Sequence, residues 1–309
     1  MITKRIIDEK GIDQTEDTVL VLGYFDGLHK GHQALFEKAR EIADKQGLKI
    51  AVMTFPESPK LAFVRYQPEL MLHLASPEDR MAQLESLGVD YLYLIDFTSH
   101  FAGNTAQDFF EKYVSRLRAK AVVAGFDYHF GSDRKESHEL RDYFNGKIVI
   151  VPSVNLDNRK ISSTRIRETI AVGDMLKTQE LLGYALSTRG IVVHGNARGR
   201  TIGYPTANLA PLDRVLLPGD GVYVADVEHN GQRYRGMASV GKNVTFDGDE
   251  LRFEVNIFDF SQDIYGDTIQ IFWLDKIREM VKFDSIDKLV AQLESDEEIA
   301  RSWTAYRNS

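Results

Sequence analysis

Apolar and polar positions in the first 183 residues alternate between two periods. Continuous apolar runs predict buried strands at 18–23, 48–54, 90–95, 120–125 and 147–151. After the first run, apolar residues recur at helical spacing and predict a helix that is closed by Gly47, with a buried face of Leu35, Phe36, Ala39, Ile42 and Ala43. Strands that alternate with helices predict an α/β domain with a doubly wound parallel sheet, as in a Rossmann-like fold.

Capping residues mark where several of the helices begin. Ser76 is placed to cap a helix that has Pro77 in its first turn, followed by two acidic residues. Thr105 and Asp108 have the spacing of a capping box and predict a helix over 106–118. A further helix over 174–182 is predicted to end at Gly183.

The pattern changes near Tyr184. From there, short strand-like runs dominate, at 189–194, 222–228, 232–240, 251–258 and 268–274. Asn230-Gly231 predicts a tight hairpin, and Asp284 is placed to cap a last helix over about 285–295. These features predict a small antiparallel β-barrel with a C-terminal helix. We therefore expect two domains, residues 1–184 and residues 185–309.

Composition narrows the class of protein. A chain of 309 residues, 43% hydrophobic and 27% charged, is typical of a soluble protein with two cores. The net charge of −8 argues against a nucleic-acid partner. There is no cysteine, which excludes disulfides and thiolate chemistry and fits a cytoplasmic location. No apolar run is long enough to span a membrane, and the N-terminus lacks the apolar core of a signal peptide. The sequence is compatible with a monomer or a homo-oligomer.

The most informative stretch is Gly-Tyr-Phe-Asp-Gly-Leu-His-Lys-Gly-His at 23–32. It places His29 and His32 at a strand-to-helix turn, where free backbone N–H groups favour phosphate. Gly23 and Gly31 allow a phosphate chain close to the backbone, and Phe25 belongs to the same turn. Two imidazoles can donate hydrogen bonds to phosphoryl oxygens as charge develops on them. The stretch predicts a nucleoside triphosphate site, against the alternative of ordinary surface histidines.

Two other stretches in the first half carry polar side chains at the expected ligand edge of the sheet. Ser163, Thr164 and Arg167 open a predicted helix, where hydroxyls and a guanidinium suit phosphate. The alternative is that the hydroxyls only cap the helix. Asp127 follows a strand end, where it could hold Mg²⁺ or ligand hydroxyls, or simply stabilise a turn.

In the second half, residues 195–208 are dense in glycine, arginine and oxygen ligands. Gly195 and Gly199 recur with Arg200 after a strand, which suits a flexible flap over phosphates. Thr206 and Asn208 offer two neutral oxygens that fit Mg²⁺ bound mainly through substrate phosphates. Glu254, on the polar face of its strand, could take a proton from an attacking alcohol. The alternatives are a plain surface loop and a solvent-facing glutamate.

In order and spacing, several of these stretches resemble the prokaryotic bifunctional riboflavin kinase/FAD synthetase family over nearly the full length of the chain. The matching stretches are 23–32, Val-Ala-Gly-Phe-Asp-Tyr-His-Phe-Gly at 123–131, Ile-Ser-Ser-Thr-Arg-Ile-Arg at 161–167, Gly-Arg-Thr-Ile-Gly-Tyr-Pro-Thr-Ala-Asn-Leu at 199–209, Gly-Val-Tyr at 221–223 and Asp-Ile-Tyr-Gly at 263–266. The resemblance implies two reactions. The second module would phosphorylate riboflavin with ATP to give FMN, and the first would transfer AMP from ATP to FMN, giving FAD and pyrophosphate.

The resemblance also implies roles for individual residues. His29 and His32 would stabilise the α-phosphate, while Ser163, Thr164 and Arg167 would bind the β- and γ-phosphates. Asp127 would position nucleotide or metal. In the kinase module, Thr206 and Asn208 would bind Mg²⁺ and the ATP phosphates, and Glu254 would be the catalytic base. The implied folds are a nucleotidyltransferase α/β domain and a six-stranded antiparallel barrel.

The chain departs from the family pattern at Pro56-Glu57-Ser58-Pro59, at Arg134-Lys135-Glu136 and at Val244-Thr245.

Three other functions compete with the expected one. Another nucleotidyltransferase of the same superfamily would have no reason to carry the second module. A class I aminoacyl-tRNA synthetase would need a lysine-rich signature and a tRNA-binding extension, which this sequence lacks. A flavin-binding regulator without turnover would bind flavin and form no product.

Overall fold

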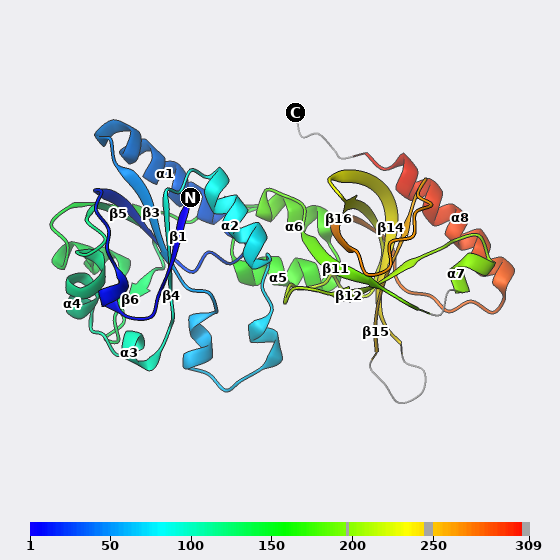
Figure 1. Ribbon diagram of the computed structural model, residues 1–309, viewed down its shortest axis with the longest axis horizontal. Coiled ribbons are helices and arrows are strands. Elements are labelled where there is room, and N and C mark those ends of the chain that lie inside the picture. The colour runs from blue at the N-terminus through cyan, green and yellow to red at the C-terminus, as the bar shows by residue number, and fades with distance from the viewer. Residues whose placement is uncertain (196–197, 244–249, 305–309) are drawn as a thin grey trace. The chain divides into compact units, whose positions relative to one another are not determined.

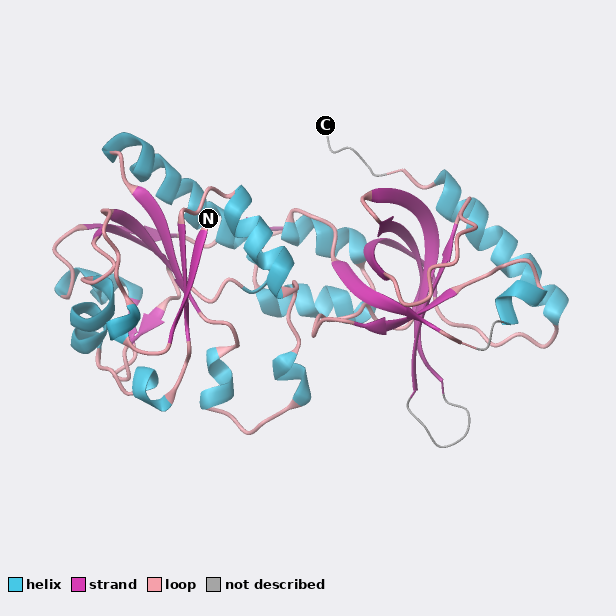
Figure 2. Cartoon of the chain, in the orientation of Figure 1, coloured by secondary structure: helices cyan, strands magenta, loops and turns pink. Residues whose placement is uncertain are grey.

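The computed structural model describes residues 1–195, 198–243 and 250–304. It divides into two compact units, each of which is described here by itself. The first consists of Met1–His73 and Pro77–Ser162, and the second of Leu74–Ser76 with the residues from Ser163 onward. Figure 1 shows the course of the chain through the two units, and Figure 2 shows their helices and strands.

The first unit is built on a six-stranded parallel sheet with the order β1-β4-β3-β2-β5-β8. Strands β1, β3, β4 and β5 of this sheet are labelled in Figure 1. Its strands are β1 (Ile2–Ile6), β2 (Thr18–Leu22), β3 (Lys49–Thr54), β4 (Tyr91–Ile95), β5 (Ala119–Gly125) and β8 (Lys147–Val151). Its helices are α1 (Lys30–Gln46), α2 (Pro77–Ser86), α3 (Ser99–Ala102) and α4 (Ala106–Phe109). The strand order reverses direction at β2 and β5, the place where doubly wound sheets bind ligands.

Alternate residues of the central strand β2 enter two separate cores. Leu20 and Leu22 pack in the core that contains Tyr93 and Phe109. Val19 and Val21 pack in the other, beneath helix α1. The sheet is therefore covered on both faces, which explains why its strands read as continuous apolar runs. The doubly wound parallel sheet expected from the sequence is confirmed.

The second unit contains a closed antiparallel barrel with the strand order β11-β12-β15-β14-β13-β16. Its strands are β11 (Ser187–Val193), β12 (Ala207–Pro211), β13 (Gly221–His229), β14 (Gln232–Asn243), β15 (Glu250–Ile257) and β16 (Thr268–Arg278). Its helices are α5 (Ser163–Val172), α6 (Met175–Leu182), α7 (Arg198–Thr201) and α8 (Ile286–Ser302). The predicted barrel and C-terminal helix are confirmed.

Shorter segments complete the chain. The 3₁₀ turns are η1 (Glu9–Gly11), η2 (Asp26–Leu28), η3 (Pro59–Ala62), η4 (Pro68–Met71) and η6 (Ser137–Asp142), and η5 (Phe110–Val114) is a π-helix. Two small hairpins pair β6 (His129–Phe130) with β7 (Lys135–Glu136) and β9 (Asn155–Leu156) with β10 (Arg159–Lys160).

Local signals placed several boundaries correctly. Gly47 and Gly183 end α1 and α6 in the left-handed conformation. Thr105 and Asp108 form the predicted capping box, and β13 and β14 are joined through Asn230-Gly231.

Other predictions of local structure were wrong. The helix expected over 106–118 stays α-helical only to Phe109 and continues as a π-helix. The last helix is capped by Ser285, whose side chain accepts from the Lys288 N–H, rather than by Asp284, and it continues to Ser302. Strands β1 and β12 were not predicted, because β1 is a largely polar edge strand and only Leu209 of β12 is buried.

Residues 163–184, which the sequence assigned to the first domain, pack with the barrel. The backbone N–H of Gly219 donates to the Ile170 carbonyl at 2.9 Å. The Tyr223 hydroxyl donates to the Gly219 carbonyl and lies against Gly173, just after α5. Helices α5 and α6 thus belong to the second compact unit. The functional division after residue 184 stays a prediction.

Candidate active sites

The first candidate site lies at the carboxyl end of β2, where the chain turns into α1. His29 is the N-cap of α1, and its Nδ1 accepts a hydrogen bond from the His32 backbone N–H at 3.3 Å. The two imidazole rings stack with their centroids 3.7 Å apart and their planes 14° from parallel. A Cβ at Gly31 would lie 3.0 Å from the His29 ring, so glycine there leaves room for the stacked pair.

Burial keeps both imidazoles neutral. Loss of hydration lowers the pKa of His29 to about 4, although the nearby carboxylate of Asp26 opposes the shift. Burial and then the neighbouring His29 hold the pKa of His32 well below its usual range. Because Nδ1 of His29 accepts a hydrogen bond, a neutral ring carries its proton on Nε2. His29 is therefore prepared to donate one N–H without carrying a charge.

The ring of His32 packs against the aromatic ring of Phe25. Phe25 is 1% exposed and meets the His32 ring edge-on, with 5.3 Å between centroids. Phe25 folds across Gly23, where a Cβ would come within 2.6 Å of its ring. Among the described residues, Nδ1 of His32 is buried and has no hydrogen-bond partner. Phe25 therefore positions His32 by packing, and its part in nucleotide binding stays a prediction.

Arg80 is a part of this site that the sequence did not single out. Its guanidinium is buried and donates to the Phe55 carbonyl at 2.9 Å, to the Tyr24 carbonyl and to the Thr54 hydroxyl. Its charge contributes to the lowered pKa of His32. Arg80 lies on α2, far from Tyr24 in sequence, and no local pattern marked it. It ties the ends of β2 and β3 together.

Asp127 follows β5, the strand next to β2 in the sheet. Its carboxylate forms an ion pair with Lys160, whose ammonium also lies 4.5 Å from the centre of the Phe126 ring. Within the part of the chain that is described, no three His, Cys, Asp or Glu side chains are grouped to hold a metal ion. In this structure Asp127 is therefore the acidic partner of Lys160.

Ser163, Thr164 and Arg167 all lie in the first two turns of α5, in the second unit. Thr164 is exposed, whereas Ser163 and Arg167 are half-buried. Arg165, between them, is 8% exposed and belongs to the buried face of α5. The predicted phosphate-binding side chains therefore share one helix N-terminal region.

The second candidate site lies on paired barrel strands. Asn208 of β12 is the direct cross-strand partner of Glu254 of β15. The Thr206 hydroxyl donates to Oε2 of Glu254 at 3.2 Å. A Cβ at Gly195 would lie 2.3 Å from the Asn208 amide, so glycine there makes room for that side chain. The structure thus brings together four of the predicted kinase residues.

Neighbouring residues hold this group in place. Asn256, two residues after Glu254 and on the same strand face, donates to the Pro205 carbonyl at 2.6 Å. Gly199 stands where a Cβ would meet the Tyr204 carbonyl at 2.1 Å, and its own carbonyl accepts from the Tyr204 N–H at 2.9 Å. These contacts fix the turn that leads to Thr206. The sequence analysis did not single out Asn256, although the alternation of side chains along β15 puts it on the same face as Glu254.

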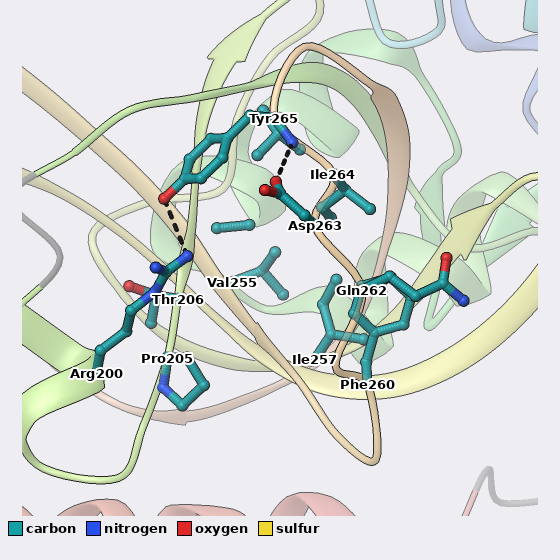
Figure 3. A pocket seen from close by; sticks show the side chains of 12 residues that line it. Arg200, Pro205, Thr206, Val255, Ile257, Phe260, Gln262, Asp263, Ile264 and Tyr265 are labelled. Atoms are coloured by element: carbon teal, nitrogen blue, oxygen red, sulfur yellow. Dashed lines mark hydrogen bonds between the residues drawn. The ribbon is translucent and has the colours of Figure 1, made fainter.

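A pocket opens beside Thr206 (Figure 3). Arg200 donates to the Tyr265 hydroxyl at 3.2 Å on one side of it, and the His194 ring stacks on Tyr265 with 3.8 Å between centroids. The rest of the lining is mostly apolar, from Val192, Pro205, Ala207, Val255, Ile257, Phe260, Gln262, Asp263 and Ile264. Glu254 does not line the pocket itself and reaches it through Thr206. Asp263, Ile264 and Tyr265 of the Asp-Ile-Tyr-Gly stretch thus line one side of the pocket, beside the predicted phosphate loop.

The two halves together define a class of protein: a nucleotidyltransferase-type α/β domain joined to a barrel that carries a hydroxyl–carboxylate pair, both suited to transferring phosphorus-containing groups. Family models for FAD synthetase and for riboflavin kinase match residues 11–165 and 182–304 respectively. The chain belongs to the bifunctional riboflavin kinase/FMN adenylyltransferase family. It catalyses flavin cofactor synthesis, in which riboflavin is converted with ATP to FMN and then to FAD.

Two curated relatives illustrate the match. The bifunctional riboflavin kinase/FMN adenylyltransferase of Listeria monocytogenes is 40% identical over 93% of this chain and 92% of its own length. That of Bacillus subtilis is 37% identical over 93% of both chains. A Streptococcus pneumoniae structure described as a macrolide-efflux protein is 58% identical, with a TM-score of 0.95 over 98% of this chain and 100% of that one. None of the helices described in our structure is long and apolar enough to cross a membrane.

Proposed function

We propose that the His29–His32 site performs the adenylyl transfer and that the Thr206–Asn208–Glu254 site performs the phosphorylation of riboflavin. The observation that supports the first assignment is the pair of buried neutral imidazoles at the N-terminus of α1. The observation that supports the second is the hydrogen bond between Thr206 and Glu254 on adjoining segments of the barrel.

In adenylyl transfer, a phosphate oxygen of FMN attacks the α-phosphorus of ATP, and pyrophosphate leaves. Negative charge grows on the non-bridging oxygens in the transition state. Nε2–H of His29 and an N–H of His32 are the donors that would stabilise this charge, in a site from which water is largely excluded. On the sequence resemblance alone, Ser163, Thr164 and Arg167 are assigned to the leaving pyrophosphate, and Gly23, Gly31 and Asp127 to the nucleotide.

In riboflavin phosphorylation, the terminal hydroxyl of the ribityl chain attacks the γ-phosphorus of ATP, and ADP leaves as the bond to the β–γ bridging oxygen breaks. Glu254 would accept the hydroxyl proton on the carboxylate oxygen that Thr206 does not occupy. Gly195, Gly199 and Arg200 would face the phosphates. The neutral oxygens of Thr206 and Asn208, beside one carboxylate, form a hard-ligand set that fits Mg²⁺. When bound, this ion would offset the charge of the ATP phosphates.

A product assay tests both assignments. Pure protein is incubated with riboflavin, ATP and Mg²⁺, and in parallel with FMN, ATP and Mg²⁺, and the flavins are separated by chromatography. FMN followed by FAD in the first reaction, and FAD in the second, is the expected result. Binding of flavin without any product in either reaction would support the regulator instead. Omission of Mg²⁺ with added chelator should stop FMN formation if the metal assignment is right.

We further propose a cytoplasmic enzyme that acts on small molecules and has no nucleic-acid partner. The cysteine-free composition and the net charge of −8 support this proposal. Cell fractionation tests the location. Light scattering of the purified protein measures whether copies associate into a homo-oligomer.

A further inference from the structure

A line of three side chains beside the His29–His32 site is not explained by the proposed mechanism. The Tyr24 hydroxyl lies 3.2 Å from Nδ1 of His73, and Nε2 of His73 lies 3.2 Å from Oε2 of Glu57. The His73 side chain is 10% exposed, so both of its ring nitrogens meet protein atoms in a nearly water-free position. The three residues belong to the first unit and come from three separate segments of it.

His73 contacts the other two residues through its two ring nitrogens. Its Nδ1 and the Tyr24 hydroxyl form a hydrogen bond, in which the imidazole tautomer decides which atom donates. Its Nε2 lies 3.2 Å from the Glu57 carboxylate, a close polar contact whose geometry is not that of a hydrogen bond. Each contact restricts the orientation of the His73 ring.

Tyr24 is also held at its backbone. Its carbonyl accepts from the Thr54 hydroxyl at 2.8 Å and from the buried guanidinium of Arg80. The Arg80 guanidinium carbon lies 5.4 Å from the centre of the Tyr24 ring. Tyr24 immediately precedes Phe25, which packs under His32. A displacement of Tyr24 would therefore move Phe25 and change the position of the His32 ring.

Glu57 and His73 stand at the two ends of a projecting segment, residues 58–72, which we call the strap. The strap carries η3 and η4 and can be followed in Figure 1 as the blue-to-cyan excursion between β3 and α2. Every residue from 62 to 69 in it is exposed, and Phe63 and Tyr66 are 70% and 65% exposed. The ring of Phe63 meets that of Phe97, just after β4, with 5.6 Å between centroids.

We propose that Glu57, His73 and Tyr24 are positioning residues for adenylyl transfer, which lock the base of the strap to the phosphate-binding turn. The inference rests on the proposed role of His29 and His32. When the contacts of His73 with Tyr24 and Glu57 are formed, the strap and the imidazole pair keep one relative placement. When these contacts are removed, the strap still folds, but the imidazoles of His29 and His32 lose their alignment with the reacting phosphate, which lowers kcat.

The test is a double-mutant cycle on FAD formation from FMN and ATP. Tyr24→Phe and His73→Phe remove the hydrogen bond with little change in volume, and each should lower kcat about tenfold, as expected for one buried hydrogen bond. The double variant should be no slower than the slower single variant, because both changes break the same link. Glu57→Gln, at a partly exposed position, should lower kcat about threefold and fold normally.

Controls separate positioning from folding. His100→Phe breaks another His–Glu contact of the same unit, at an exposed position, and should leave kcat unchanged. A merely structural role would lower the melting temperature or the active fraction, measured by burst titration with FMN, and leave kcat per active site unchanged.

The outcomes also distinguish this inference from the function it rests on. If His29→Ala retains FAD formation, the proposed site itself is wrong. If His29→Ala abolishes it while Tyr24→Phe and His73→Phe stay within twofold of the parent, only the positioning role is overturned. Effects of Tyr24→Phe and His73→Phe that multiply in the double variant would likewise overturn it.

Discussion

His29 caps the helix that carries His32, and the two imidazoles stack at 3.7 Å while the His32 backbone N–H donates to the His29 ring. One residue thus closes the helix end and fixes its own tautomer. The same hydrogen bond leaves Nε2–H of His29 as the free donor. A single local arrangement produces both the turn and the chemical group that the adenylyl transfer would use.

His29→Ala should lower FAD formation from FMN by about 10²-fold or more, because it removes a donor to the developing charge. FMN formation from riboflavin should persist, since the kinase residues lie in the barrel. Chromatography of the two reactions measures both rates. Equal loss of the two activities would contradict the two-site assignment.

The stability of the first unit should depend on pH through His29. Its pKa falls from 6.5 to about 4 on folding, so between these values the unfolded chain binds the extra proton. The free energy of unfolding should therefore rise between pH 4 and 6.5, by about 3 kcal/mol from this group, and level off below pH 4. Both tryptophans lie in the barrel unit, so amide hydrogen exchange in β2 and α1 is the suitable measurement. His29→Asn, which keeps a capping acceptor but does not titrate, should flatten the profile.

Glu254→Gln should abolish FMN formation, by about 10²-fold or more, because an amide cannot accept the hydroxyl proton. It should leave FAD formation from added FMN intact. Thr206→Ser, which keeps the hydroxyl that donates to Glu254, is the matched control and should retain most kinase activity. A fully active Glu254→Gln kinase would show that another group takes the proton.

Gly195→Ala should impair the kinase without unfolding the barrel. The new Cβ would stand 2.3 Å from the Asn208 amide, which must move aside. We expect kcat/KM for ATP to fall at least about tenfold in riboflavin phosphorylation. Gly241→Ala is the control, since its Cβ would meet only Met280 atoms at 3.4 Å or more. If both variants behave like the parent, Asn208 does not bind the nucleotide.

Asp296→Ala should destabilise the second unit. Asp296 is fully buried on α8 and receives three hydrogen bonds from Arg278 of β16, between 2.8 and 3.0 Å. Its removal leaves a largely buried guanidinium unpaired, at a cost of about 3 kcal/mol. Denaturation followed by tryptophan fluorescence reports this unit. Asp284→Ala removes the exposed pair with Lys288 and should change stability by less than about 0.5 kcal/mol.

Local chemistry explains which helix ends were predictable. The capping residues Gly47, Gly183 and Thr105 make their capping hydrogen bonds with the adjacent helical turn. A few neighbouring residues of the sequence were therefore enough to predict their role. The α4 helix deviated because its continuation is set by packing: Phe110 and Tyr113 are buried against the sheet and draw the chain into a π-turn. Serine and aspartate are similarly favourable N-cap residues, so the residue type does not distinguish Ser285 from Asp284. The backbone conformation of the folded chain decides which of the two caps the helix.

The sequence by itself determined the two fold types and the identity of the chemical groups. Hydrophobic period and turn residues act locally, and motif order is a property of the chain alone. Only the tertiary structure brought Thr206, Asn208 and Glu254 together, through the pairing of β12 with β15. It also placed Arg80 and His73 around Tyr24, because contacts between residues some 50 positions apart depend on how strands and helices pack. Burial, which makes His29 and His32 neutral donors, was likewise decided by the fold, because desolvation depends on everything that surrounds a group.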